Sequence, residues 1–327
     1  MLSVIMPVFN EEKYIAQAVD SILCQTFSDF EYIIINDGSS DSSIDIIKSY
    51  NDKRIRVIDN GENIGISQSL NKGINISQGE YIARMDANDI ATQNRFEMQI
   101  NYLENNEVTL VGTHHDIINE NSVVIGQASQ RYFEPDQTKS YLAFYNICHA
   151  SLMVKSDTLP QIEKIYRPIM AEDFDLYQRL SLKYNFAVLP DRLMQIRILE
   201  NGLSGNWPLM EDAVNKLRIQ QLKQIDLSPT KEQKQIHSKL INRHYDALKK
   251  EKLSSVFNWI HTVITANKKL KFFPEPYFNE EWYIRLTKIL KSRKHKRIID
   301  FYRYNKIASL IGKKRSLSDL IYIYIRS

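Results

Sequence analysis

The sequence predicts an α/β protein with a Rossmann-like mixed sheet flanked by helices and a mainly helical, basic C-terminal extension. Over roughly the first hundred residues, short apolar runs alternate with amphipathic helical segments, which is typical of βαβ units around a parallel sheet. Three of these apolar runs end in polar, acid-bearing loops. Lys and Arg residues gather in the last hundred residues, where helical patterns follow one another without strands.

The first part of the chain is expected to build the parallel strands. Continuous apolar runs of this kind indicate strands that are buried on both faces. Asn10 is expected to cap the first helix, which carries Ile15 to Leu23; Asp41 is expected to start the second, and residues 67–76 form the third. The strands are expected at 3–8, 31–35, 55–58 and 81–85. Because open α/β sheets bind ligands at the carboxyl ends of their strands, the polar loops should gather at one binding edge.

The remainder of the chain is expected to change character twice. Residues 1–107 form the ligand-binding half, 108–208 a second half with mixed or antiparallel strands, and 209–327 a helical basic region. Strands of the second half are expected at 108–112, 116–119, 123–125 and 151–154. Helices of the basic region are expected at 210–225, 231–249, 254–266 and 280–290.

Composition limits the compartment and the partners. The 327-residue chain has a net charge of +4, but residues 231–327 hold 23 Lys and Arg against 8 Asp and Glu. The basic region should therefore face an anionic partner. Two cysteines, no signal-peptide pattern and no apolar run of about 18 residues favour a reducing, cytoplasmic location without a spanning helix.

Two nucleotide-binding classes are disfavoured because their motifs are missing. No Gly-x-Gly-x-x-Gly fingerprint follows the first strand, and the chain has no P-loop sequence. A zinc-type site at His114, His115 and His149 is also disfavoured, because no Cys or carboxylate stands at ligand spacing beside them.

The stretch from Gly79 to Asp89 is the strongest local signal for chemistry. After the run Tyr81–Ala83, three polar residues follow within four positions: Asp86, Asn88 and Asp89. Closely spaced oxygen ligands suit a hard divalent cation bridged to phosphate. The alternative is a strand-to-helix loop in which one Asp caps the next helix.

The run Ser3–Tyr14, SVIMPVFNEEKY, resembles the opening of family-two glycosyltransferases of the GT-A fold. The same order of motifs continues through 21–27, 36–41 and 63–65, and Asp86-Ala87-Asn88-Asp89 is similar to the family's Asp-x-Asp region. The resemblance covers roughly residues 1–205. It implies an inverting enzyme that moves a sugar from a nucleotide-sugar donor, UDP-linked, to a hydroxyl of a glycan or lipid-linked acceptor in surface polysaccharide biosynthesis.

The resemblance also implies which residues hold the donor. Asp37 would accept the ring N–H of uracil, although it could equally be a turn residue before Gly38. Asn63 has the same turn alternative, and Arg84 either reaches a phosphate or pairs with a nearby carboxylate. The full set implied for the nucleotide sugar is Pro7, Phe9, Asn10, Glu12, Asp37, Asn63, Arg84, Asp86 and Ala87.

The implied cofactor is a divalent cation, Mn²⁺ or Mg²⁺, held by Asp86 and Asn88. The family pattern favours Asp where this chain has Asn88, and His where it has Leu199. A neutral amide oxygen attracts a cation less than a carboxylate does. We therefore expect weaker or more selective metal dependence than is usual in the family.

Residues 171–180 are expected to form a helix with Glu172 and Asp173 in its first turn. Acidic residues there are common for reasons of the helix dipole alone. The run also resembles the family's Glu-Asp motif, which implies Asp173, in preference to Glu172, as the catalytic base of a single displacement. His149, Glu172 and Arg197 are expected to line the acceptor side or to support the site from behind.

The basic C-terminal region interleaves charge with aromatic residues. In a sugar-transfer enzyme this favours peripheral attachment of residues 231–327 to an anionic membrane surface, on the cytoplasmic face of the inner membrane, over nucleic-acid binding. The basic run 291–297 and the apolar end 320–325 contribute most to this pattern, and a solvated helical surface is the alternative. For the whole chain, a non-catalytic nucleotide-sugar-binding scaffold is the other function left open, and a sugar nucleotidyltransferase is disfavoured because no glycine-rich, lysine-bearing loop follows the first strand.

Overall fold

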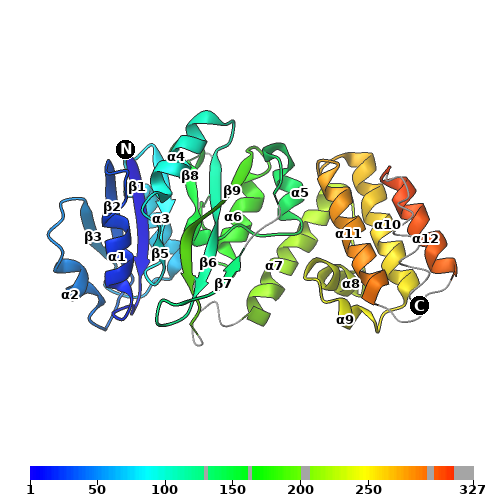
Figure 1. Cartoon of the computed structure of the whole chain (residues 1–327), viewed down its shortest axis with the longest axis horizontal. Coiled ribbons are helices and arrows are strands. Elements are labelled where there is room, and N and C mark those ends of the chain that lie inside the picture. Colours follow the sequence, from blue (N-terminus) through cyan, green and yellow to red (C-terminus); the bar gives the residue numbers. More distant parts are fainter. Residues whose placement is uncertain (129–131, 161–163, 200–206, 293–297, 313–327) are drawn as a thin grey trace. The chain divides into compact units, whose positions relative to one another are not determined.

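The computed structural model describes residues 1–128, 132–160, 164–199, 207–292 and 298–312 (Figure 1). Most of the basic run 291–297 and all of the apolar end 320–325 lie outside these residues. The chain divides into two compact units. One comprises Met1–Thr138 with Asn146–Ala213, and the other comprises Lys139–Tyr145 with Val214–Ser327.

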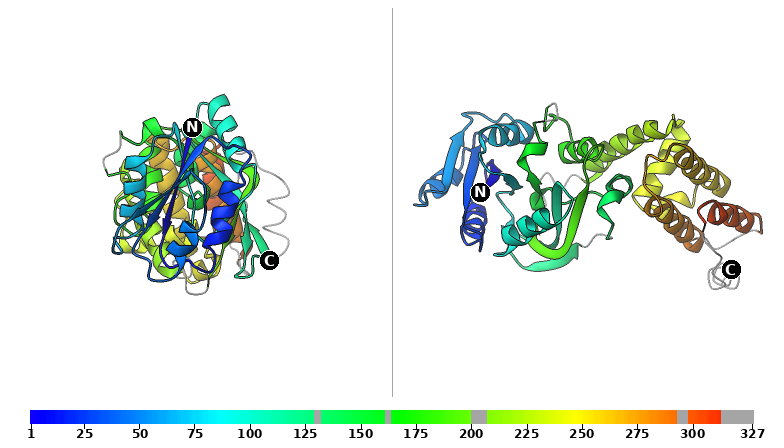
Figure 2. Two further views of the ribbon diagram at one scale, coloured as in Figure 1. Left: turned by 90° about the vertical axis from the view of Figure 1, so that its left-hand side faces the viewer. Right: turned by 90° about the horizontal axis from the view of Figure 1, so that it is seen from above.

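The four expected strands of the first half form a parallel array, which confirms that prediction. They are β1 (Leu2–Val8), β2 (Phe30–Asn36), β3 (Ile55–Asp59) and β4 (Tyr81–Arg84), in the order β3-β2-β1-β4. The connecting helices are α1 (Ile15–Leu23), α2 (Ser43–Lys48) and α3 (Ile66–Ile76). Helices lie on both faces of the sheet (Figure 2), so β1, β2 and β4 are buried along almost their whole length, whereas β3 at the edge is partly exposed.

The second half extends the same sheet with antiparallel and mixed pairings. Beyond β4 the order continues with β8 (Met153–Lys155), β6 (Leu110–Ile118), β9 (Phe186–Arg197) and β5 (Ile90–Ala91), and β7 (Val124–Ala128) pairs with β6. The two strands expected at 108–112 and 116–119 are in fact the single strand β6. The strand β9 was not expected, because Pro190, Asp191 and Arg192 interrupt its apolar pattern.

One predicted cap is wrong, and a cap that was left open as an alternative is absent. Asn10 does not cap α1, which begins at Ile15; its backbone is left-handed, with φ 54°, and its Oδ1 accepts a hydrogen bond from the Ser40 backbone N–H at 2.8 Å. Asp89 does not cap α4 (Arg95–Asn105), because its Oδ1 accepts from the Arg197 backbone N–H at 2.8 Å. Both side chains join loops that are distant in sequence instead of ending a helix.

Two further α-helices complete the first unit. The helix α5 (Thr138–Leu142) begins there, and α6 (Glu172–Leu180) buries Phe174, Leu176, Tyr177 and Leu180 on its inner face, as its apolar spacing predicts. Single 3₁₀ turns lie at Pro135–Gln137, His149–Ser151 and Ser156–Thr158, and a fourth follows α7 at Leu222–Ile225.

The second unit is helical around its own core. Its helices are α7 (Trp207–Gln221), which starts in the first unit, α8 (Lys231–Ile241), α9 (Tyr245–Leu248), α10 (Leu253–Leu270), α11 (Tyr277–Ser292) and α12 (Ile298–Leu310). Trp259 and Trp282 are fully buried, and Phe144, from the segment 139–145, packs against the Trp282 ring. Glu281 and Arg285 form a buried ion pair on α11. Among the helices that the structure describes, none is long and apolar enough to cross a membrane.

Candidate active site

The loops that follow β1 and β2 are joined into one wall at the carboxyl edge of the sheet. Glu12 Oε2 accepts from the Ser42 backbone N–H at 3.0 Å, and Asp41 Oδ2 accepts from the Glu12 backbone N–H at 3.0 Å. With the Asn10–Ser40 contact, these bonds cross-link the two loops along their length. The Phe9 ring is exposed on this wall. Side chains expected to frame a nucleoside therefore hold each other's loops in place.

Asp37 closes the wall on the side of β3. Its side chain is 4% exposed, and Oδ1 accepts from Asn60 Nδ2 and from the Ile64 backbone N–H, each at 2.9 Å, while Oδ2 accepts from the Gly65 backbone N–H at 3.0 Å. Asn63 is exposed within the loop that these bonds anchor. A carboxylate has about four lone-pair positions, so one remains for a ligand N–H.

Asp86 leaves the end of β4 and forms an ion pair with Arg84. Arg84 Nη2 lies 2.5 Å from Asp86 Oδ1, and the arginine is 5% exposed whereas the Asp86 side chain is 32% exposed. The sequence left two roles open for Arg84, contact with a phosphate or an ion pair with a carboxylate. In this structure, Arg84 forms the ion pair. Ala87 is buried in the core below, so only its backbone faces the loop.

Glu11 is a member of this cluster that the sequence reasoning did not single out. Asn88 Nδ2 donates to Glu11 Oε1 at 3.4 Å. The pKa of Glu11 is raised to about 7, first by burial and then by the negative charges of Asp86 and Asp41, while Arg197 opposes these effects. Its position at the end of β1, between two residues already assigned to the donor site, was the available signal.

Arg197 supports the Asp86–Asp89 loop from below. Its Nε donates to the Asn88 carbonyl oxygen at 2.8 Å, and its guanidinium lies 4.3 Å from the centre of the Tyr14 ring. With the Asp89 bond to its backbone N–H, it contacts the loop at two points. Arg197 is buried, and these bonds hold the loop in position from behind.

The acidic pair of α6 forms the opposite side of the site. Asp173 Oδ2 accepts from Asn146 Nδ2 at 3.2 Å. Burial raises the pKa of Asp173, opposed by the Phe174 backbone N–H and by Asn146. Burial also raises the pKa of Glu172, to about 7, with the Asp173 charge as the next cause, and Asp86 adds to the effect. The two carboxyl groups are thus close to the end of β4, although they are far from it in the sequence.

His149 lies behind this pair. Its Nε2 is 2.8 Å from the Tyr166 hydroxyl oxygen, and burial, with the charge of Arg84, holds the pKa of His149 well below its usual value. His149 is therefore a neutral, hydrogen-bonded side chain at physiological pH. Tyr166 was not recognisable from the sequence, because no motif surrounds it.

Sequence comparison identifies the family. The profile of glycosyl transferase family 2 matches residues 3–158. The chain is 35% identical over 205 residues to an uncharacterized glycosyltransferase of Methanocaldococcus jannaschii, covering 61% of this chain and 71% of that protein. It is 36% identical over 186 residues to the O-antigen biosynthesis glycosyltransferase WbnJ of Escherichia coli, covering 55% and 71%.

The chain belongs to glycosyltransferase family 2. Solved structures agree on the fold of this family-two glycosyltransferase. Residues 1–349 of S. aureus TarS in complex with UDP-GlcNAc superpose with a TM-score of 0.57 at 17% identity, covering 96% of this chain and 93% of that piece of TarS. The mannosyltransferase PcManGT from Pyrobaculum calidifontis, in complex with GDP-Man and Mn²⁺, has a TM-score of 0.54 at 15% identity, covering 100% and 88%. The predicted GT-A fold is therefore confirmed.

In this family-two glycosyltransferase, Asp86 and Asn88 are the residues that could contribute to a cation site. Among the residues that the structure describes, no three His, Cys, Asp or Glu side chains lie close enough to hold a metal ion. Asp86 and Asn88 together offer a carboxylate and an amide oxygen at the loop. Such a pair fits a cation that takes its remaining oxygens from a diphosphate and from water.

Proposed function

We propose that this family-two glycosyltransferase moves a sugar from a UDP-linked donor to a hydroxyl group of a glycan or lipid-linked acceptor, with inversion, in surface polysaccharide biosynthesis. One observation carries the proposal: the half-buried acidic pair at the start of α6 faces the end of β4, where Glu172 interacts electrostatically with Asp86 and Asp173 with Arg84. A carboxylate that can accept a proton thus lies beside the loop where the donor is expected.

The donor side is argued from the wall between β1 and β3. Three hydrogen bonds fix the Asp37 carboxylate in the wall and leave one acceptor position. The ring N–H of a uracil base could donate to that position. The backbone of Pro7–Asn10 and the loop with Glu12 and Asn63 would enclose the nucleoside. The UDP-GlcNAc complex of TarS, which has a similar fold, supports a uridine nucleotide as the first choice.

Asp173 is proposed as the base. The bond from the acceptor oxygen to the anomeric carbon forms, the bond from that carbon to the diphosphate breaks, and its electron pair leaves with the diphosphate while the hydroxyl proton moves to Asp173. Hydrogen bonds from Asn146 and the Phe174 backbone favour the ionised form of Asp173. Glu172 has a pKa of about 7 and would be partly protonated at neutral pH, which favours Asp173.

A divalent cation is proposed at Asp86 and Asn88. When bound, it would offset the negative charge of the leaving diphosphate. Arg197 holds the backbone that carries Asn88, so the orientation of both side chains depends on it. Since Asn88 is neutral, this cation should bind more weakly than in a relative with two carboxylates.

Peripheral membrane attachment is proposed for the basic region. Residues 231–327 carry an excess of 15 positive charges, and each Lys or Arg near an anionic surface contributes about 1 kcal/mol. Such a surface would place the enzyme, from the cytoplasm, next to lipid-linked acceptors. Flotation of the intact protein with vesicles of anionic phospholipid at moderate salt should recover it in the lipid layer; recovery equal to that with neutral vesicles contradicts the attachment.

The test of the main proposal has a binding arm and a turnover arm. Thermal-shift measurements with UDP-Glc, UDP-Gal, UDP-GlcNAc and GDP-Man identify the donor, because binding stabilises the folded state by mass action. Release of the nucleoside diphosphate from that donor is then compared for the wild type, Asp173→Asn and Asp175→Asn. Loss of the base should reduce turnover by about 10²–10⁴-fold while the donor still stabilises the protein.

Asp175→Asn is the matched control, because Asp175 lies on the same helix but pairs with Arg167 and Arg179. It should lower stability without abolishing turnover. Unchanged turnover in Asp173→Asn contradicts the assigned base, and no stabilisation by any of the four nucleotide sugars contradicts the donor proposal. Asn88 and Leu199 favour one alternative, a non-catalytic nucleotide-sugar-binding protein; it predicts stabilisation by a donor with no turnover in the wild type.

A further inference from the structure

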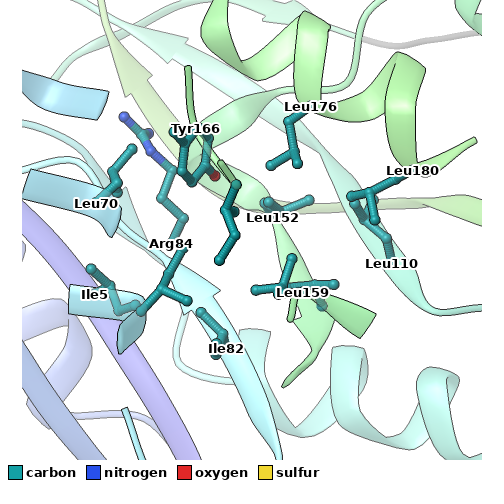
Figure 3. A pocket seen from close by; sticks show the side chains of 13 residues that line it. Ile5, Leu70, Ile82, Arg84, Leu110, Leu152, Leu159, Tyr166, Leu176 and Leu180 are labelled. Atoms are coloured by element: carbon teal, nitrogen blue, oxygen red, sulfur yellow. The ribbon is translucent and has the colours of Figure 1, made fainter. Parts of the chain in front are cut away.

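Arg84 is a buried cation at the centre of the site. Its side chain runs beside an apolar cavity of about 20 Å³, with Leu70 and Ile5 along the stem and the guanidinium end next to Tyr166 (Figure 3). The apolar stem suits this lining, but the charged group has been removed from water. A buried charge of this kind is stable only with anionic partners or hydrogen bonds around it.

Asp86 is the first of these partners, and it contacts only one of the three guanidinium nitrogens. The ion pair joins Nη2 to Asp86 Oδ1 at 2.5 Å, while Arg84 Nε and Nη1 are buried without a hydrogen-bond partner in the part of the chain that the structure describes. Arg84 and Asp86 are two residues apart at the end of β4. The arginine therefore fixes the direction in which Asp86 leaves the strand and retains donor capacity of its own.

The second set of partners lies on the side of α6. The charge of Arg84 acts on Glu172, Asp173 and Tyr166, and for both carboxyl groups it opposes the effect of burial. The other charges that face Glu172 are Asp173 and Asp86, and both are negative. Asp173 has a hydrogen-bond donor in Asn146, which is neutral. Arg84 is thus a positive charge that acts on both carboxyl groups.

The neighbouring buried arginine, Arg95, shows the contrast. Its Nη2 donates to the backbone carbonyl oxygens of Arg84 and Leu152, at 2.8 and 3.3 Å, and Nε donates to Gln99 at 3.0 Å. These bonds hold strands and helix together. Arg95 therefore has a packing role, whereas Arg84 contacts a carboxylate that is exposed toward the site.

We infer that Arg84 is a positioning residue shared by both halves of the site: it orients Asp86 toward the donor and supplies the positive charge that offsets the burial of Glu172 and Asp173. This inference rests on the proposed function, and it assigns Arg84 a role other than binding a donor phosphate. Both functions need a charge, but only the first needs a donor at the position of Nη2, which a lysine ammonium, ending one bond closer to the backbone, does not reach.

Arg84→Gln and Arg84→Lys separate these two roles. The first readout is ¹³C NMR titration of the Glu172 and Asp173 carboxyl groups in the free protein, assigned with Glu172→Gln and Asp173→Asn. Removing a nearby positive charge should move the carboxyl titrations up by about 1 pH unit or more in Arg84→Gln, and Arg84→Lys should stay near the wild type. The control is Arg54→Gln, which removes another ion-paired arginine, bonded to Asp52, and should leave both titrations in place.

The second readout is the affinity for UDP in the presence of Mn²⁺, measured by calorimetry. Both Arg84 variants should bind about tenfold more weakly or worse, because neither places a donor at the position of Nη2, which contacts Asp86. Carboxyl titrations in Arg84→Gln that coincide with the wild type overturn the inference. If Arg84→Gln does not fold, Arg84→Lys decides: wild-type UDP affinity, or titrations displaced upward, overturns it.

The two readouts also separate this inference from the proposed function. The carboxyl titrations need neither donor nor acceptor, so they report on Arg84 even if the enzyme transfers no sugar. Failure of the wild type to bind UDP would contradict the proposed donor and leave the titration test of Arg84 standing.

Discussion

One added methyl group at Gly38 should damage the nucleotide wall much more than the same group at Gly61. Both glycines have φ of +76°, a left-handed backbone that L residues adopt at a cost. They differ in what a Cβ atom would meet. At Gly38 it would lie 2.6 Å from the Glu62 carbonyl carbon and 2.7 Å from the Asn63 backbone nitrogen, whereas at Gly61 nothing lies within 4 Å.

The magnitude follows from these two terms. A left-handed conformation costs an alanine about 1–2 kcal/mol, and the lower entropy of the unfolded chain returns about 0.4–1 kcal/mol. Gly61→Ala should therefore lose about 1 kcal/mol of unfolding free energy. At Gly38 the overlap is with backbone, which cannot rotate away, and overpacking adds about 1–3 kcal/mol. Gly38→Ala should lose about 2–4 kcal/mol.

The displaced backbone is the loop whose N–H groups bind Asp37, so Gly38→Ala should also weaken UDP binding. Urea unfolding followed by circular dichroism measures the stability. Calorimetry with UDP measures the binding. Equal destabilisation by the two substitutions, or wild-type UDP affinity in Gly38→Ala, refutes the reasoning.

Two further expectations follow from the charges of the site. Because the folded-state pKa of Glu172 is raised from 4.5 to about 7, the folded protein binds this proton more tightly than the unfolded chain, so its contribution to stability should fall as pH rises from about 4.5 to about 7. Glu172→Gln should flatten the dependence of the melting temperature on pH across that window, and an unchanged profile contradicts the assignment. Asn88→Asp adds a negative charge beside Glu11 and Asp86, so it should lower the melting temperature in EDTA and increase the stabilisation by Mn²⁺; stabilisation equal to that of the wild type would argue against a cation at this loop.

The parallel half of the sheet was predictable from the sequence alone. Strands buried on both faces must be apolar along their whole length, and the helices between them must carry an apolar stripe, so each element leaves a signal in its own residues. The signal for α6 also lies in neighbouring residues, because its acidic first turn and its apolar inner face fall within one short stretch of the sequence. The order of the motifs then indicated the family, since several spaced runs must agree at once.

Only the tertiary structure decided how these pieces act on each other. Strand β9 pairs with β6, although the polar residues within β9 interrupt the apolar pattern by which a strand is recognised. Arg197, at the end of β9, donates a hydrogen bond to the loop that carries Asn88. Arg84 forms an ion pair with Asp86 and also acts on Glu172, a residue far along the chain. Burial sets the pKa of such groups, and burial depends on chain segments that meet only in the folded state. The sequence therefore determines which residue types are present at the sheet edge, and the fold determines which of them interact electrostatically.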